Sequence, residues 1–151
     1  MKRIMALDVG ERRIGVAVSD PLGIIARTLT VVHRKTDEEA ATQILALLDE
    51  QDAGRLIVGY PRLLSGKIGS QAQAVEGFVE ILEAATEVPI EMWDERLSTV
   101  TAARLMTEQG QSTREQKSRI DAVAAAVILQ DYLDARRLRA SLGHEDEDNY
   151  E

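Results

Sequence analysis

The sequence has 151 residues, 44% of them hydrophobic, no cysteine and a formal net charge of −8. This length predicts one domain with its own core, and the lack of cysteine excludes disulfides and thiolate metal sites. No apolar run approaches the ~20 residues of a membrane span, and the acidic balance argues against an extended nucleic-acid-binding surface.

The first third of the chain predicts three consecutive strands. The runs at 4–7 and 14–19 are rich in β-formers and are joined through Gly10 and Glu11, as in a hairpin. Neither run alternates polar with apolar residues, so we expect both strands to be covered on both faces. A third strand at 24–32 carries more polar residues and is expected to be more exposed.

The remainder of the chain alternates predicted helices and strands. Thr36 and Glu39 form a capping box, and Gly54 is a plausible stop for the helix that begins there. There follow, in chain order, a buried strand at 56–60, a helix around 75–82, a strand at 89–93, a helix from 98 or 99 to about 110, a polar loop over 111–118 and a last helix from about 119 to 139. Strands joined by helical crossovers run parallel, so we predict an α/β fold, a mixed five-stranded sheet with helices packed on it.

We expect residues 1–140 to form this domain and residues 141–151 to form an acidic disordered tail. The tail holds five acids and no lysine or arginine, and its few apolar residues cannot offset the entropy lost on ordering it. Removing these five from 26 leaves 21 acids against 18 bases, so the body remains compatible with a phosphate backbone. The N-terminus is unlike a signal peptide, and we expect a cytoplasmic protein.

Acidic residues follow two predicted strands and open the last helix. Asp8 ends the first strand, Asp94 and Glu95 follow the strand at 89–93, and Asp121 shares a helix face with apolar residues. Sites in open α/β sheets form beyond the carboxyl ends of the strands, so we expect these acids to meet. Hard oxygen ligands suit Mg²⁺ or Mn²⁺, and such ions activate water for phosphodiester hydrolysis. We place Asp121 in the first helical turn, where the helix dipole favours its ionised form.

Each of these acids also has an ordinary structural interpretation. Asp8 is a common turn residue, Asp121 is a common helix N-cap, and Asp94 with Glu95 is compatible with a solvated helix entry neutralised by Arg96. For each residue alone these alternatives stay open. Three acids at one end of a sheet favour a site.

Four segments carry a resemblance to a known family. They read "ALDVGERRIGVAVSD", "LIVGYP", "WDERLSTVTA" and "IDAVAAAVILQDYLD". In this order they resemble the signature blocks of the YqgF family, bacterial proteins described as pre-16S rRNA nucleases and as Holliday-junction-resolvase-like. The resemblance covers the chain from about Lys2 to Asp134 and implies an RNase H-like fold, in agreement with the predicted elements.

The resemblance implies a metal-dependent nuclease that matures the 5′ end of pre-16S rRNA. The family's acidic triad falls on Asp8, Glu95 and Asp121, which would hold one or two Mg²⁺ or Mn²⁺ ions and carry catalysis. The implied partners are RNA first, structured DNA second, and the precursor of the ribosomal small subunit, with no membrane. The candidates for positioning phosphate, for each of which solvated surface charge is the alternative, are Arg13, Arg62, Lys67, Arg96, Lys117 and Arg119.

Other functions stay open beside this one. The loop at 63–66 departs from the family's Asn-Met-Asp-Gly-like pattern, which leaves substrate preference unsettled. A Holliday-junction-type resolvase would need a homodimer to cut two strands symmetrically. A noncatalytic ribosome-assembly module would not need the complete acidic triad. An actin-like ATPase also opens with Asp-x-Gly, but the chain is too short for its second domain and has no G-x-x-x-x-G-K-[ST] match.

Overall fold

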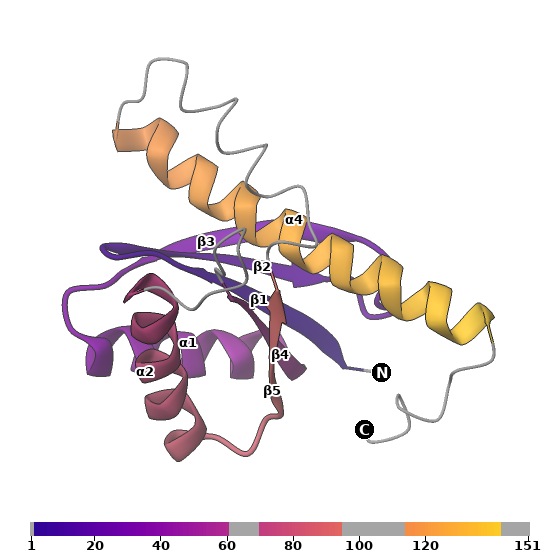
Figure 1. The fold of residues 1–151 in the computed structure, drawn as a ribbon, viewed down its shortest axis with the longest axis horizontal. Coiled ribbons are helices and arrows are strands. Elements are labelled where there is room, and N and C mark those ends of the chain that lie inside the picture. Colours follow the sequence, from indigo (N-terminus) through magenta and orange to yellow (C-terminus); the bar gives the residue numbers. More distant parts are fainter. Residues whose placement is uncertain (1, 61–69, 95–113, 143–151) are drawn as a thin grey trace.

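The computed structural model describes residues 2–60, 70–94 and 114–142, with the backbone alone for residues 70 and 114–120. The elements in this part of the chain are β1 (Arg3–Val9), β2 (Arg13–Ser19), β3 (Ala26–His33), α1 (Asp37–Glu50), β4 (Ala53–Tyr60), α2 (Ser70–Ala85), β5 (Ile90–Asp94) and α4 (Arg114–Ser141). They form a five-stranded sheet of order β3-β2-β1-β4-β5 with α4 on one face and α1 with α2 on the other (Figure 1). The predicted fold class, a mixed five-stranded α/β sheet with packed helices, is confirmed.

Antiparallel and parallel pairing meet at β1. The pairs β1–β2 and β2–β3 are antiparallel, as expected for strands joined by short turns, and β1–β4 and β4–β5 are parallel through helical crossovers. Along β1 and β2 every residue after the first is buried, which confirms the prediction of cover on both faces. Strand β3 lies at the edge and is more exposed.

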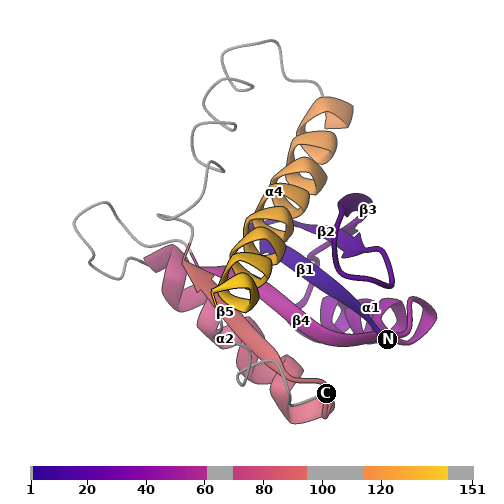
Figure 2. The ribbon, with the colours of Figure 1, turned by 90° about the vertical axis from the view of Figure 1, so that its right-hand side faces the viewer.

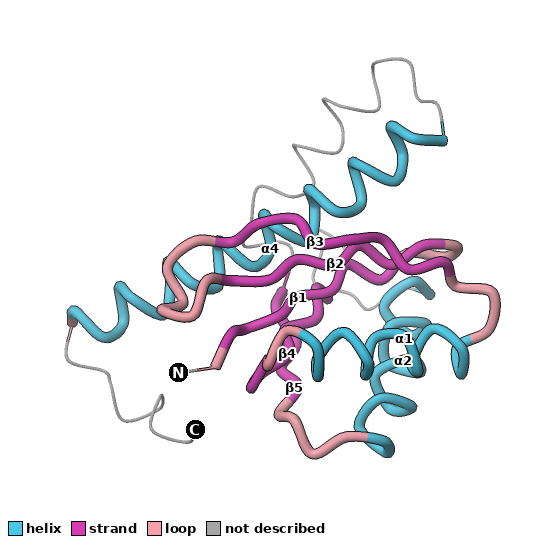
Figure 3. Tube along the Cα trace, turned by 180° about the vertical axis from the view of Figure 1, so that it is seen from behind, coloured by secondary structure: helices cyan, strands magenta, loops and turns pink. Residues whose placement is uncertain are grey.

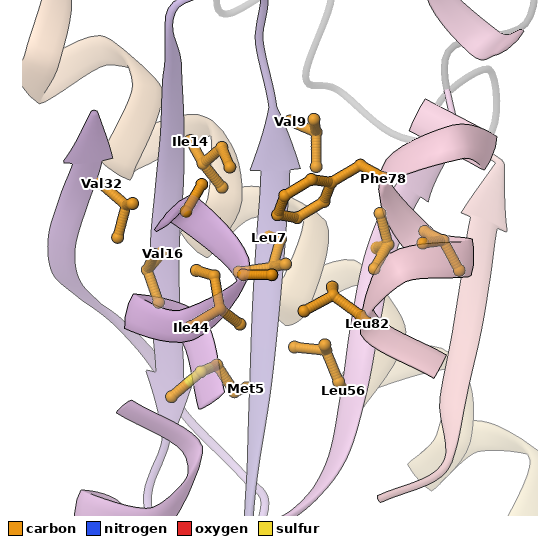
Figure 4. Close-up of a cluster of buried hydrophobic side chains, with 14 of the residues drawn as sticks. Met5, Leu7, Val9, Ile14, Val16, Val32, Ile44, Leu56, Phe78 and Leu82 are labelled. Atoms are coloured by element: carbon orange, nitrogen blue, oxygen red, sulfur yellow. The ribbon is translucent and has the colours of Figure 1, made fainter. Parts of the chain in front are cut away.

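Alternate residues of β1 point into two separate cores. Met5, Leu7 and Val9 pack against α1 and α2 (Figure 4). Ile4 and Ala6 face the other way and pack against α4, which runs across the strands rather than along them (Figure 2). The side of the sheet that a β1 side chain faces therefore follows from its place in this alternation.

Helix α1 begins as predicted but ends differently. The Thr36 side chain accepts the backbone N–H of Glu39 at 3.1 Å, so the Thr36 half of the predicted capping box is confirmed. The predicted stop at Gly54 is wrong, because α1 ends at Glu50, Asp52 has a left-handed φ of 52° and Gly54 lies inside β4. A Cβ on Gly54 would lie 2.9 Å from the Cβ of Lys2, so this glycine permits close approach of the chain before β1.

The turn between β2 and β3 is held by one carboxylate. Asp20 Oδ1 accepts the backbone N–H groups of Ile24 at 2.7 Å and Ile25 at 2.9 Å. The hydrogen bond from Ile25, and to a smaller extent that from Ile24, stabilise the ionised carboxylate and hold the pKa of Asp20 below its ordinary value of 3.8. The ionised form of Asp20 therefore stabilises this turn.

Helix α4 is longer than the sequence analysis predicted. It begins at Arg114, whereas we predicted a polar loop over 111–118 and a helix from about 119. Lys117 and Arg119 therefore lie on the helix, in turns that project beyond the sheet (Figures 1 and 3). Glutamate, glutamine, lysine and arginine are good helix formers, and polarity alone was not a reason to end the helix.

The third helix, predicted to end near 110, falls outside the described residues, as does most of the acidic tail predicted over 141–151; Ser141 is the last residue of α4, and residues 143–151 are not described. Among the helices in the described part of the chain, none combines the length and hydrophobicity that a membrane crossing requires.

Candidate active site

One carboxylate is buried near the carboxyl end of the central strand. Asp8 precedes the last residue of β1, is 4% exposed and pairs with Gly15 of β2. The alternation along β1 places Asp8 on the α4 face, with Ile4 and Ala6. It is a paired strand residue, which rules against the turn interpretation. Aspartate is rarely buried this fully, and sites in open α/β sheets form beyond the carboxyl ends of the strands, so Asp8 is a candidate for a functional acid.

The partner of Asp8 in the sheet lets α4 come close. A Cβ on Gly15 would collide with the backbone carbonyl oxygen of Asp121, so no larger residue fits there without moving the helix. Two candidate acids, Asp8 and Asp121, are thus carried by chain segments that both adjoin Gly15. A glycine inside an apolar strand often marks such a close approach. Gly15 is such a signal in the sequence, and no prediction above rests on it.

Asp121 is held by an arginine from the neighbouring strand. Arg13 Nε donates to Asp121 Oδ2 at 2.8 Å, and the two side chains are 25% and 23% exposed. We predicted Arg13 as a residue that positions phosphate, and the structure places it against a candidate metal-binding acid. Asp121 lies about two turns inside α4. The N-cap alternative and the predicted contribution of the helix dipole are therefore both wrong for this residue.

A second arginine fixes the turn between β1 and β2. The Arg34 guanidinium donates to the carbonyl oxygen of Gly10 at 2.9 Å and to the first carboxylate of α1 at 2.7 Å, and lies 5.3 Å from the ring centroid of Phe78. The N–H of Gly10 donates to the carbonyl oxygen of Arg13 at 2.8 Å, and a Cβ on Gly10 would lie 2.7 Å from that oxygen. Arg34 thus ties the turn between Asp8 and Arg13 to α1 and α2, which the sequence analysis missed.

Strand β5 carries the neighbouring acid Asp94 on the other side of the sheet. Asp94 is the last residue of β5, not the first one beyond it, and pairs with Tyr60. Trp93 packs with the core under α4, so the alternation places Asp94 on the face of α1 and α2. The predicted site residues that lie outside the described part of the chain are Arg62, Lys67, Glu95 and Arg96.

The donor set suits a hard divalent cation. Asp8 and Asp121 offer carboxylate oxygens, the ligands that Mg²⁺ and Mn²⁺ prefer. The described residues contain no group of three or more histidine, cysteine, aspartate or glutamate side chains that could hold a metal, and the third acid predicted for the triad, Glu95, is not among them. Arg13 already offsets the charge of Asp121, and a bound cation would relieve repulsion between the two acids in the same way.

Comparisons with known proteins agree with this geometry. A family model described as "RuvX: Holliday junction resolvase" matches residues 2–135. A Chloroflexus aurantiacus protein named "Putative pre-16S rRNA nuclease" is 46% identical over 142 residues, which cover 94% of this chain and 93% of that protein. A Clostridium acetobutylicum protein of the same name is 44% identical over 133 residues, covering 88% and 98%. The solved structure of Thermus thermophilus RuvC with a Holliday junction substrate aligns with a TM-score of 0.54 over 95% of this chain and 98% of that one, at 16% identity, which shows a shared fold.

Proposed function

Because the chain belongs to the RuvX family, the YqgF family that its motifs resemble, and is therefore a nuclease that hydrolyses phosphodiester bonds, we propose that its substrate is pre-16S rRNA. The observation that carries the proposal is the burial of Asp8 beside Asp121. Asp8 pairs in the sheet with Gly15, and the backbone of Asp121 lies directly against Gly15. The names of the relatives that are 44% and 46% identical support RNA as the substrate. With a precursor of the ribosomal small subunit as its substrate, the protein would act in the cytoplasm.

We assign catalysis to Asp8, Glu95 and Asp121, as ligands of one or two Mg²⁺ or Mn²⁺ ions. When bound, these ions would lower the pKa of a water molecule and stabilise the leaving oxygen. Asp8 supplies a carboxylate that is already withdrawn from solvent and fixed by β1, so binding a cation requires little further ordering of this ligand. Asp121 is kept in one orientation by Arg13.

Arg13 has a second role in this proposal. A guanidinium carries five N–H donors, and in the described part of the chain Arg13 uses only Nε, on Asp121. Its terminal N–H groups remain to bind a phosphate oxygen of the substrate, as arginine commonly does. The other candidates for phosphate contacts remain those that the sequence suggested, Arg62, Lys67, Arg96, Lys117 and Arg119.

The test is an assay of purified protein on matched RNA, single-stranded DNA and four-way-junction substrates with Mg²⁺, Mn²⁺ or EDTA. We expect RNA cleavage with metal and none with EDTA. Asp8→Asn should reduce cleavage to that of the buffer blank and weaken Mn²⁺ binding in calorimetry. Asp49→Asn, the same change on the exposed face of α1, should do neither. Cleavage by Asp8→Asn at the wild-type rate would contradict the assignment.

A second candidate is resolution of DNA junctions. The description of the family model favours it. It would require a homodimer, because two strands must be cut symmetrically. Preferential, paired nicking of the four-way junction by a species that sediments as a dimer would favour this candidate over RNA processing. Metal binding without cleavage of any of the three substrates would favour a noncatalytic ribosome-assembly module.

A further inference from the structure

A cavity of about 770 Å³ opens under the last turns of α4, at the end of β1 opposite to Asp8. Its walls come from the starts of β1 and β4, the turn between β2 and β3, the segment before β5 and the C-terminal part of α4. We call it the basic groove, because its charged lining consists of Lys2, Arg3, Arg55, Arg136, Arg137 and Glu87. Its volume is within the range of ligand-binding pockets.

The charge of the groove is opposite to that of the protein. Five bases and one acid line it, in a chain whose net charge is −8. Three of the bases make ion pairs with acids that do not line the groove: Lys2 with Asp52 at 3.8 Å, Arg55 with Glu91 at 3.2 Å and Arg137 with Asp134 at 2.7 Å. These ion pairs offset part of the positive charge, but the lining itself remains predominantly basic and favours a negatively charged ligand over a positively charged one.

Arg3 gives the most specific indication of an anionic ligand. Its Nε is buried and has no hydrogen-bond acceptor in the described part of the chain. The Arg3 side chain as a whole is only partly buried and lines the groove. A guanidinium suits a carboxylate or phosphate partner, and an unsatisfied buried donor is unfavourable. An anion that enters the groove would supply the acceptor that Arg3 lacks.

The rest of the lining is apolar. Ile4, Val88, Pro89 and Leu133 line the groove, and Leu22 is 66% exposed in its wall. A ligand that fits both parts has anionic groups and flat apolar surfaces. A single RNA strand has both, in its phosphates and in the faces of its nucleobases. Proteins that bind such strands combine a positively charged groove with side chains that contact the nucleobase faces, and in this groove the contacting side chains are aliphatic. Inorganic phosphate would leave the apolar lining unused.

We propose that the basic groove binds a single-stranded segment of the RNA substrate, away from the bond that is cut. This inference rests on the proposed function. Asp121 and Arg136 lie on one helix, about 22 Å apart along its axis at 1.5 Å per residue. About seven stacked nucleotides would span that length at 3.4 Å each.

The test measures RNA binding in EDTA, where no metal-dependent cleavage occurs. Fluorescence anisotropy would use a labelled single-stranded RNA of about 20 nucleotides, longer than the span between site and groove. Ala140→Glu places an acid in the groove at an exposed helix position. Leu138→Glu makes the same charge change on the same helix, at a residue that is 60% exposed and outside the lining. Arg136→Gln removes a basic charge from the groove without adding an acid.

We expect Ala140→Glu and Arg136→Gln to weaken RNA binding about fivefold at 0.1 M salt, the effect of one lost phosphate contact on a single strand. The slope of log affinity against log salt should fall by about 0.7 for each of these variants. Leu138→Glu should match the wild-type protein in both measurements, and circular dichroism melting should show that all variants are folded.

Wild-type affinity and salt slope in both groove variants would overturn the inference. So would binding of adenosine monophosphate that Ala140→Glu abolishes while RNA binding stays unchanged, because the groove would then be a mononucleotide site. If RNA is cleaved but the groove variants bind it like the wild type, only this inference is contradicted. If RNA binding depends on the groove but no RNA is cleaved, only the proposed function is contradicted.

Discussion

Gly15→Ala should move α4 and weaken the candidate active site. The new Cβ would collide with the carbonyl oxygen of Asp121, and the clash is with backbone, so no change of rotamer relieves it. Overpacking of a core costs typically 1–3 kcal/mol, and we expect about 3 kcal/mol here. For a chain of 151 residues that corresponds to a fall in Tm of roughly 6–12 °C.

The control for this substitution is Gly77→Ala on the exposed side of α2. A Cβ there has nothing within 4 Å, and alanine is favoured over glycine in a helix by about 1 kcal/mol. Gly77→Ala should therefore raise Tm slightly, whereas Gly15→Ala lowers it. Mn²⁺ binding should weaken only in Gly15→Ala, because only there does the helix that carries Asp121 shift relative to Asp8.

The measurements are thermal and denaturant unfolding, followed by calorimetric titration with Mn²⁺ at a temperature where both variants are folded. A Gly15→Ala protein as stable as the wild type, with unchanged Mn²⁺ affinity, would refute the close contact between β2 and α4. Lower stability with unchanged Mn²⁺ affinity would show that the contact is structural only.

Three further predictions concern other parts of the molecule. Arg34→Met keeps an apolar side chain beside Phe78 but loses the hydrogen bonds to Gly10 and to Asp37. Unfolding by denaturant should show a loss of at least about 1.5–3 kcal/mol, the range for one hydrogen bond to a charged group, and no loss would mean that the turn is held without Arg34. Because the pKa of Asp20 is lowered in the folded protein, ionised Asp20 stabilises the fold above its ordinary pKa, and this contribution is lost as pH falls through the folded pKa. Between about pH 5 and 3, Tm should therefore fall more steeply for the wild type than for Asp20→Asn, and parallel curves of Tm against pH would contradict this. Deletion of 143–151 should leave Tm unchanged and strengthen RNA binding at low salt only, because the acidic residues of this tail repel RNA over a Debye length of about 10 Å at 0.1 M salt. Weaker RNA binding or a large fall in Tm after the deletion would show that the tail packs on the body.

The local patterns of the sequence were sufficient for most of the fold. The hairpin, the Thr36 cap and the apolar faces of α1, α2 and α4 depend on residues close together in the chain, where strand and helix periods act directly. The order of short turns and helical crossovers then determined which strands run parallel. The strand pattern predicted a site from Asp8, Asp121 and the pair at 94–95, and the resemblance to one family selected Glu95 from that pair. Asp8 is buried near the carboxyl end of β1.

Contacts between distant residues were decided only by the tertiary structure. Gly54 looked like a helix stop, yet it permits the close approach of Lys2 just before β1. Gly15, on which no prediction rested, permits the close approach of α4 to β2. The pairing of Arg13 with Asp121 joins residues from β2 and α4, and the basic groove gathers bases from β1, β4 and α4. Local propensity depends on interactions between residues that are close in sequence. Close approach, ion pairing and burial depend instead on which surfaces the completed sheet and helices bring together.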